Sequence, residues 1–219
     1  MTRLAIFDCD GTLVDSGGVI CTAMARACEA EGLPAPDDAA TRRIIGLSLL
    51  EAVTTLHPGL PLPRLERLAG GYKRAFQDLR AEQAVHEPLF DGIADVLGSL
   101  AERGWALGVA TGKSDRGLAL CLAAHGIAPH FVTLQTADRH PSKPHPGMVE
   151  AAMRDAGAEP AGTVVIGDTT YDMAMARAAG ARAIGVAWGY HHPEELRDAG
   201  AHAIAERPHD IPALLEPTA

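Results

Sequence analysis

The chain has 219 residues, of which 47% are hydrophobic and 21% are charged. This length fits one domain, or one domain with a modest insertion, and the composition excludes a mainly disordered chain. With 28 acidic and 19 basic residues the net charge is −9. Because we find no basic stripe against this acidic background, we expect neither nucleic acid nor an anionic membrane as a partner.

Five short apolar runs predict the strands of a sheet. Each run ends in Gly, Asp or Thr and lacks polar alternation, which is typical of parallel strands buried on both faces. In chain order these runs are 3–7, 106–110, 131–134, 163–166 and 183–186. The segments between the later strands carry apolar residues at helical spacing and mostly end in glycine. This alternation predicts an α/β fold with a doubly wound parallel sheet.

The strand pattern disappears between Asp15 and about Pro88. Helical periodicity replaces it, and the expected helices span 19–30, 41–56 and 63–84. We therefore expect an inserted all-helical domain at 15–88, with the α/β core formed by 1–14 and 89–219. The proline-rich tail from Arg207 onward is expected to be loosely held.

Membrane, disulfide and zinc chemistry are not favoured. No stretch approaches the roughly 20 apolar residues that span a bilayer, and the first apolar run is interrupted at Asp8, so we expect no secretory signal. The four cysteines lack CxxC spacing, which favours free thiols in the cytoplasm. The ten histidines include no i, i+4 pair that would bind zinc from one helix.

Two aspartates follow the first predicted strand. If the strand continues through Asp10, then Asp8 and Asp10 point to the same side of the sheet, and Gly11 lets the chain turn away. Open α/β sheets bind ligands at the carboxyl ends of their strands. Because like charges this close repel, a hard cation with oxygen ligands, most simply Mg²⁺, would stabilise the pair. The alternative is that Asp10 is only a turn residue.

A second pair of aspartates follows a later strand. Asp168 leaves the end of that strand, and Asp172 comes one helical turn later. Taken alone, Asp168 could simply cap the following helix. After another strand, Thr111 and Gly112 offer a hydroxyl and backbone donors to an anion.

Lysine is rare in this chain. Among the 19 basic residues only three are lysines, namely Lys73, Lys113 and Lys143. Lys113 follows Thr111-Gly112, and Lys143 lies in a Ser-Lys-Pro sequence. A compact ammonium suits a site where one charge touches both a phosphoryl oxygen and a carboxylate. A lysine taken singly is more often a solvated surface residue.

The order of these motifs along the chain is specific. The motifs are Asp-x-Asp-Gly-Thr at 8–12, Thr111, Ser-Lys-Pro at 142–144 and Gly-Asp-x-x-x-Asp at 167–172. Together they resemble the haloacid dehalogenase-like (HAD) superfamily over essentially the whole chain. The insertion at 15–88 resembles the helical cap of that superfamily, and residues 43–48 resemble the cap segment of its phosphoglycolate phosphatase-like branch. The resemblance implies a Rossmann-like core with an inserted cap.

The resemblance also implies catalytic and metal-binding roles. Asp8 would attack phosphorus and form an aspartyl-phosphate, while Asp10 would act as general acid and then as base for the hydrolytic water. Mg²⁺ would be held by the Asp8 side chain, the Asp10 backbone carbonyl and Asp168. Asp172 would help to position Asp168 or Lys143.

The implied activity is Mg²⁺-dependent hydrolysis of a small phosphorylated metabolite, for example phosphoglycolate. The phosphoryl oxygens would be held by Thr111, the Gly112 amide and Lys143. Leaving-group specificity would come from cap side chains such as Arg42, Arg43 and Ser48, and Arg43 could bind a substrate carboxylate or lie exposed on its helix. The leaving group itself and the choice between monomer and homodimer stay open.

Other activities agree less well with these motifs than hydrolysis does. Asp10 argues against carbon–halogen cleavage, because true dehalogenases do not keep an acid there. Thr111-Gly112 stands where many relatives carry Thr-Asn or Ser-Asn, which removes a side-chain amide near the phosphate. Phosphoglucomutase-like relatives keep Asp10, but their cap usually carries a basic residue just after the glycine-containing turn, whereas here Leu47, Leu49 and Leu50 surround Ser48, which favours simple hydrolysis. A receiver-like phospho-aspartate switch and a purely structural cation site are further alternatives, and the helical insertion argues against the switch.

Overall fold

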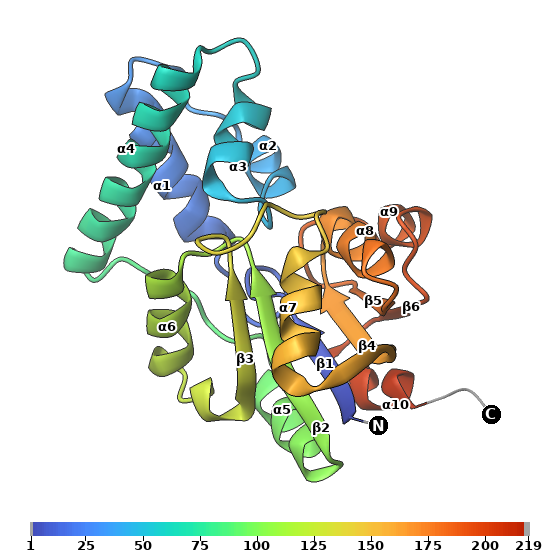
Figure 1. Cartoon of the computed structure of the whole chain (residues 1–219). Coiled ribbons are helices and arrows are strands. Elements are labelled where there is room, and N and C mark those ends of the chain that lie inside the picture. Colours follow the sequence, from blue (N-terminus) through green and yellow to red (C-terminus); the bar gives the residue numbers. More distant parts are fainter. Residues whose placement is uncertain (1, 217–219) are drawn as a thin grey trace.

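A computed structural model describes residues 2–216 and gives a six-stranded parallel sheet with the order β3-β2-β1-β4-β5-β6 (Figure 1). The strands are β1 Thr2–Phe7, β2 Trp105–Thr111, β3 Phe131–Thr136, β4 Ala158–Gly167, β5 Arg182–Val186 and β6 Ala203–Ala205. The predicted α/β fold class is confirmed, and the five predicted strands are all present. The short strand β6 was not predicted, because three residues carry too little periodicity to detect.

The strand order reverses between β1 and β4. These two strands pair directly, with Phe7 opposite Ile166, although more than 150 residues separate them in sequence. On the other side of β1, Phe7 lies opposite Val109 of β2. Ligands of doubly wound sheets bind at such a reversal, outside the carboxyl ends of the strands. The register therefore brings Asp8, Asp168 and Thr111 to one place.

Helices cover both faces of the sheet. One face is covered by α5 (Ile93–Glu102), α6 (Asp115–Ala124) and α10 (Ile211–Leu215), and the other by α7 (Gly147–Ala156), α8 (Thr170–Ala178) and α9 (Pro193–Asp198). Side chains of β1 alternate between the two layers, so Phe7 packs in the first and Ile6 in the second. Burial on both faces explains why the strands lack polar alternation.

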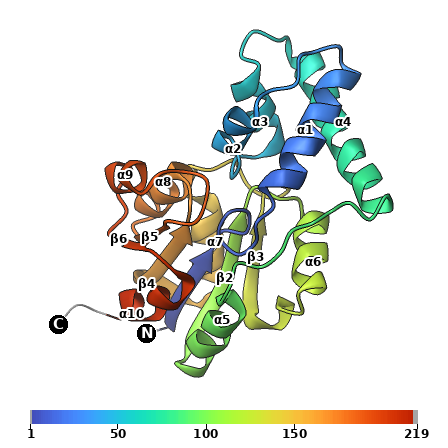
Figure 2. The same cartoon turned by 180° about the vertical axis from the view of Figure 1, so that it is seen from behind.

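Four further helices lie together beyond the carboxyl ends of β1, β2 and β3 (Figures 1 and 2). They are α1 (Gly17–Ala30), α2 (Asp38–Arg43), α3 (Leu49–Leu56) and α4 (Leu62–Ala81), and we call them the helical segment. This segment has an apolar cluster of its own, which includes the buried Met24, Val53 and Leu68. It is joined to the sheet by two chain crossings that lie side by side, where Val14 bridges Leu89.

Two expectations are wrong in detail. The helix expected at 41–56 is two helices, α2 and α3, because the chain turns at Gly46 with φ +99°, a conformation that disfavours every residue with a Cβ. The tail is not loosely held as far as the structure describes it, since Ile211 and Leu215 of α10 are buried in the core. None of the helices within residues 2–216 is long and apolar enough to cross a membrane.

Candidate active site

Asp8 is the first residue after β1 and is buried. Its backbone amide still donates to Ile166 O at 2.9 Å, so the strand pairing fixes the point where the side chain leaves the sheet. Its Oδ1 accepts from the Cys9 amide at 2.7 Å and lies 2.9 Å from Lys143 Nζ. Its Oδ2 is also buried but has no hydrogen-bond partner among residues 2–216. An unpartnered buried carboxylate oxygen is costly, so this position suits a positively charged ligand.

Lys143 lies between two carboxylates. Its Nζ is 2.9 Å from Asp8 and 2.7 Å from Asp172 Oδ1, and its side chain has no exposed area. The other oxygen of Asp172 accepts from the amide and the hydroxyl of Thr169, at 3.1 and 2.7 Å, as part of the capping box that begins α8. A motif that starts a helix thus also fixes the carboxylate that holds the lysine.

Asp168 is fixed by two donors from distant loops. Its Oδ1 accepts from the Thr12 hydroxyl at 2.8 Å, and its Oδ2 accepts from the Tyr190 amide at 2.9 Å. A Cβ at Gly11 or at Gly189 would overlap Asp168, so both glycines are needed for the loops to come this close. Thr12 belongs to the Asp-x-Asp-Gly-Thr motif, whereas Tyr190 belongs to none of the motifs and contributes only its backbone amide, which no sequence pattern marks.

Burial dominates the electrostatics of the cluster. It raises the pKa of Asp8 from 3.8 to about 7, although the Lys143 ammonium opposes this. Burial, followed by the charges of Asp8 and Asp172, also raises the pKa of Asp168 well above its usual value. Burial by itself lowers the pKa of Lys143, but the two carboxylates beside it outweigh that effect and raise it. The carboxylates are therefore short of positive charge.

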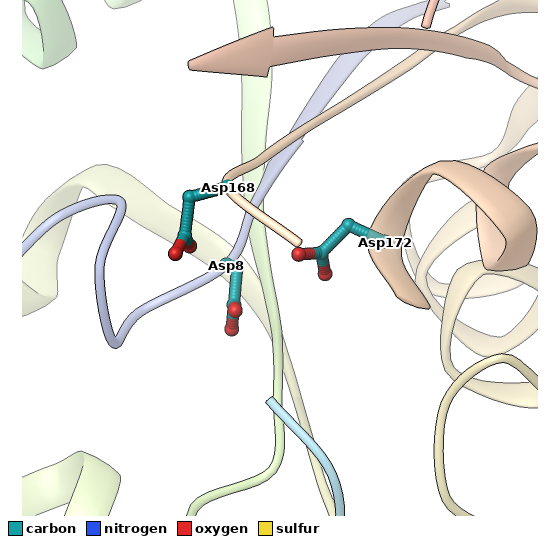
Figure 3. A group of neighbouring side chains, drawn as sticks. All are labelled: Asp8, Asp168 and Asp172. Atoms are coloured by element: carbon teal, nitrogen blue, oxygen red, sulfur yellow. The ribbon is translucent and has the colours of Figure 1, made fainter. Parts of the chain in front are cut away.

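The residues fit a divalent cation. One carboxylate oxygen from each of Asp8, Asp168 and Asp172 lies within 4.8 Å of the others. Figure 3 shows these side chains converging from the ends of β1 and β4 and from the start of α8. Oxygen ligands and uncompensated negative charge suit a hard cation, and Asp8 Oδ2 has no hydrogen-bond partner in the part of the chain that the structure describes.

Asp10 belongs to a second, neighbouring ion pair. The chain turns at Gly11, and Asp10 faces Lys113 Nζ at 2.9 Å and accepts a hydrogen bond from the Ser16 hydroxyl. Glu87 lies 2.6 Å from the same Lys113 ammonium. Asp8 and Asp10 are thus each paired with a different lysine. Glu87 was missed by sequence reasoning, because it lies in a chain crossing and belongs to no motif.

Thr111 and Gly112 lie where the helical segment meets the sheet. Thr111 is the buried last residue of β2, and Lys113 N donates to its hydroxyl at 3.2 Å. A Cβ at Gly112 would overlap Leu47 O and approach Gly46 O to 2.8 Å. The loop between α2 and α3 therefore rests on Gly112, and no larger residue fits there without moving it.

A cavity of about 760 Å³ lies between the helical segment and the sheet. It reaches Asp10, Gly112 and Ser48, but not Asp8, which is buried behind them. Of the three expected specificity residues only Ser48 lines the cavity. Arg43 instead makes two hydrogen bonds of 2.7 and 2.8 Å to Glu195 of α9, so it joins the helical segment to the core. Its 152-residue separation from Glu195 left no sequence signal.

Comparison with known proteins agrees with this geometry. A family model described as "Haloacid dehalogenase-like hydrolase" matches residues 5–186. The chain is 37% identical to the "Probable phosphatase IndB" of Dickeya dadantii, over 94% of this chain and 90% of that protein. It is 34% identical to a phosphoglycolate phosphatase of Chromobacterium violaceum, over 93% of this chain and 94% of that protein. A solved hydrolase from Pseudomonas syringae has a TM-score of 0.86 at 27% identity and covers 98% of each chain.

Proposed function

The chain belongs to the haloacid dehalogenase-like hydrolase family, and we propose that it is an Mg²⁺-dependent phosphatase that hydrolyses a small phosphorylated metabolite through an aspartyl-phosphate. The observation that carries the proposal is the buried lysine–carboxylate cluster. Lys143 is held between Asp8 and Asp172, and one carboxylate oxygen of Asp8 lies within 4.8 Å of one from Asp168. Among the residues that the structure describes, the buried Oδ2 of Asp8 has no hydrogen-bond partner. The phosphatases among its relatives support the same reaction class.

The proposed reaction has two steps. Asp8 attacks phosphorus, the bond to the leaving oxygen breaks, and Asp10 donates a proton to that oxygen. Asp10 then takes a proton from a water that attacks the aspartyl-phosphate, which releases phosphate and restores Asp8. Thr111, the Gly112 amide and Lys143 bind the phosphoryl oxygens, because positioning and neutralised charge are what phosphoryl transfer needs most.

Mg²⁺ is the cofactor in this proposal. The side chains of Asp8 and Asp168 and the Asp10 backbone carbonyl would hold it, with Asp172 as a supporting residue. When bound, the ion supplies positive charge that offsets the phosphoryl oxygens and the carboxylates. The raised pKa values of Asp8 and Asp168 support a cation here, since both carboxylates need one to ionise fully.

The helical segment is proposed to act as a cap, at 15–88, over a core of 1–14 and 89–219. Its loop between α2 and α3 rests on Gly112, and Ser48 N donates to the Ser142 hydroxyl at 2.8 Å. A cap in this position would exclude water from the aspartyl-phosphate. The four cysteines are buried and unpaired, which supports the proposed cytoplasmic location.

Replacing the proposed nucleophile gives the direct test. Asp8→Asn should reduce phosphate release by about 10⁴-fold or more while the protein stays folded. Asp91→Asn is the matched control and should retain full activity, because Asp91 is solvent-exposed in the α/β part of the chain. Phosphate release by Asp8→Asn at the wild-type rate would show that Asp8 is not the nucleophile.

The lifetime of the phosphorylated enzyme separates the alternatives. A phosphatase should lose its aspartyl-phosphate within one catalytic cycle and release inorganic phosphate. A phospho-aspartate switch would retain the group for seconds or longer. A mutase would return the phosphoryl group to a sugar, so the labelled product would be an isomerised sugar phosphate instead of free phosphate.

A further inference from the structure

The wall of the cavity opposite the sheet carries an arginine held in place without a carboxylate. Arg80 lies in the last turn of α4 and lines the cavity. Its Cζ is 6.0 Å from the centroid of the Phe76 ring, and Lys113 Nζ is 5.9 Å from the same ring. Phe76 thus contacts Arg80 through a cation–π interaction, and within residues 2–216 the guanidinium donors have no hydrogen-bond partner, so they can bind another group.

Two more cations line the same cavity. Both are exposed side chains, Lys73 of α4 and Arg116 of α6. Within residues 2–216 neither of them, nor Arg80, forms an ion pair with a carboxylate. Both views show the C-terminal end of α4 next to α6 (Figures 1 and 2). In a chain of net charge −9, three uncompensated cations around one cavity point to an anionic occupant.

The acids of this cavity do not neutralise those cations. Asp10 is already paired with Lys113 and Ser16. Asp138 accepts from the backbone amide of Asp115 at 2.8 Å, so its carboxylate is used within the core. Apolar residues form much of the remaining wall, among them Met24, Leu47 and Leu120.

The size of the cavity bears on the leaving group. At about 760 Å³ it falls in the range of sites that bind drug-sized ligands, of roughly 300–1,000 Å³. A two-carbon leaving group would fill only a small part of it. Because the cavity reaches Asp10 and Gly112, its occupant would be the group that leaves from phosphorus.

We propose that the leaving group has an apolar body and a second anionic group, a carboxylate or a phosphate, and that Arg80 together with Arg116 binds this second anion. The inference rests on the proposed phosphatase activity. A guanidinium suits the role, since its planar donors match both anions in a bidentate manner. The alternative is that Arg80 only stabilises the C-terminal end of α4, where a cation favours the helix dipole.

Three synthetic substrates of similar size test the proposal. They are 4-carboxybenzyl, 4-phosphonobenzyl and 4-carbamoylbenzyl phosphate, of which the last is the neutral match of the first. The wild-type enzyme should show a kcat/KM about tenfold higher for at least one anionic substrate than for the carbamoyl substrate. A preference for the carboxybenzyl substrate identifies the second anion as a carboxylate, and a preference for the phosphonobenzyl substrate identifies it as a phosphate, which the phosphonate mimics.

The variants assign the preference to a residue. Arg80→Gln should bring the ratio of anionic to neutral kcat/KM close to one. Arg74→Gln, an exposed arginine of the same helix that does not line the cavity, is the matched control and should keep the wild-type ratio. A merely structural Arg80 would alter all three substrates alike and leave the ratio unchanged.

Two results would overturn the inference. One is a wild-type ratio of one, and the other is an undiminished ratio in Arg80→Gln. Hydrolysis of p-nitrophenyl phosphate in the same assay separates this failure from failure of the proposed function. If p-nitrophenyl phosphate is hydrolysed and the wild-type ratio is one, only the inference of a second anionic group is contradicted. If no substrate releases phosphate, the proposed phosphatase activity is contradicted as well.

Discussion

The carboxyl edge of the sheet and the cavity wall formed by α4 differ in how their positive charges are paired. At the sheet edge Lys143 is buried, and both of its neighbours are buried carboxylates at 2.9 and 2.7 Å. On α4, Arg80 is partly exposed, is held by an aromatic ring and has no carboxylate partner within residues 2–216. The sheet edge therefore holds its one lysine between carboxylates and still has an excess of negative charge, which suits a cation and the phosphoryl group, whereas the cations on the α4 wall have no carboxylate partner among the described residues and suit an anionic part of the substrate. The difference suggests that reaction chemistry and substrate choice are assigned to separate regions.

The largest test of this contrast removes the cation from the buried cluster. Lys143→Met should lower kcat/KM by about 10³-fold, because a donor to the phosphoryl oxygens is lost. It should also lower the free energy of unfolding by roughly 3–5 kcal/mol, because Asp8 and Asp172 stay buried without a cation between them. Urea unfolding and phosphate release measure the two effects.

A double variant separates the two consequences. Lys143→Met with Asp172→Asn should recover part of the unfolding free energy, because one uncompensated charge is removed as well. It should not recover activity. Wild-type stability in the single Lys143→Met variant would contradict a buried charge cluster at the sheet edge.

The next largest effect concerns the metal. Mg²⁺ at about 100 times its dissociation constant should stabilise the wild-type protein by roughly 2.7 kcal/mol. Asp168→Asn should lose most of this gain, because it removes a proposed ligand charge while keeping the volume of the side chain. Thermal unfolding with and without MgCl₂ measures the gain, and Asp91→Asn is again the control. An undiminished gain in Asp168→Asn would exclude Asp168 as a ligand.

A smaller effect tests whether the two regions must meet. Gly112→Ala would push the loop of Gly46 and Leu47 away from the sheet and should lower kcat/KM roughly 10- to 100-fold. Gly98→Ala is the control, because a Cβ there meets open space on α5 and should stabilise the helix by up to about 1 kcal/mol. Unchanged kinetics in Gly112→Ala would mean that this contact is not needed for turnover.

The smallest effect concerns the ion pair that joins the regions. The hydrogen bond from Arg43, followed by that from the His192 amide, lowers the pKa of Glu195 from 4.5 to about 2, so the stability from these contacts is fully present above pH 4.5 and is lost as the pH falls through about 2. Because both side chains are partly exposed to solvent, we expect the pair to contribute less than about 1 kcal/mol. The difference in urea stability between wild type and Arg43→Gln should therefore shrink from pH 7 to pH 3. A difference that grows on acidification would contradict the pair.

The sheet could be predicted from the sequence because its signals are local. Strands buried on both faces appear in the sequence as short apolar runs, and an aspartate is the first residue after both β1 and β4. The parallel sheet then brings Asp8 and Asp168 together without further information. Lys143 could be singled out because only three lysines exist in the chain.

The rest depends on contacts between distant loops. The pairing of Lys113 with Glu87 follows from the path of a chain crossing, which no periodicity describes. Arg43 carried the same ambiguity, since an arginine on a short helix gives no sign of whether it faces substrate, solvent or another helix. The break of the expected 41–56 helix at Gly46 was missed because helical spacing continues on both sides of it.

The paired chain crossings at Val14 and Leu89 have an evolutionary consequence. Asp15 N donates to Pro88 O at 2.8 Å and Phe90 N to Leu13 O at 3.1 Å, so the chain re-enters the sheet next to its exit point. An inserted segment whose two ends lie side by side can change in length, or be replaced by another segment, without altering the order of the strands. Recombination at the two chain crossings can therefore change the substrate range during evolution, while the residues at the carboxyl edge of the sheet stay the same.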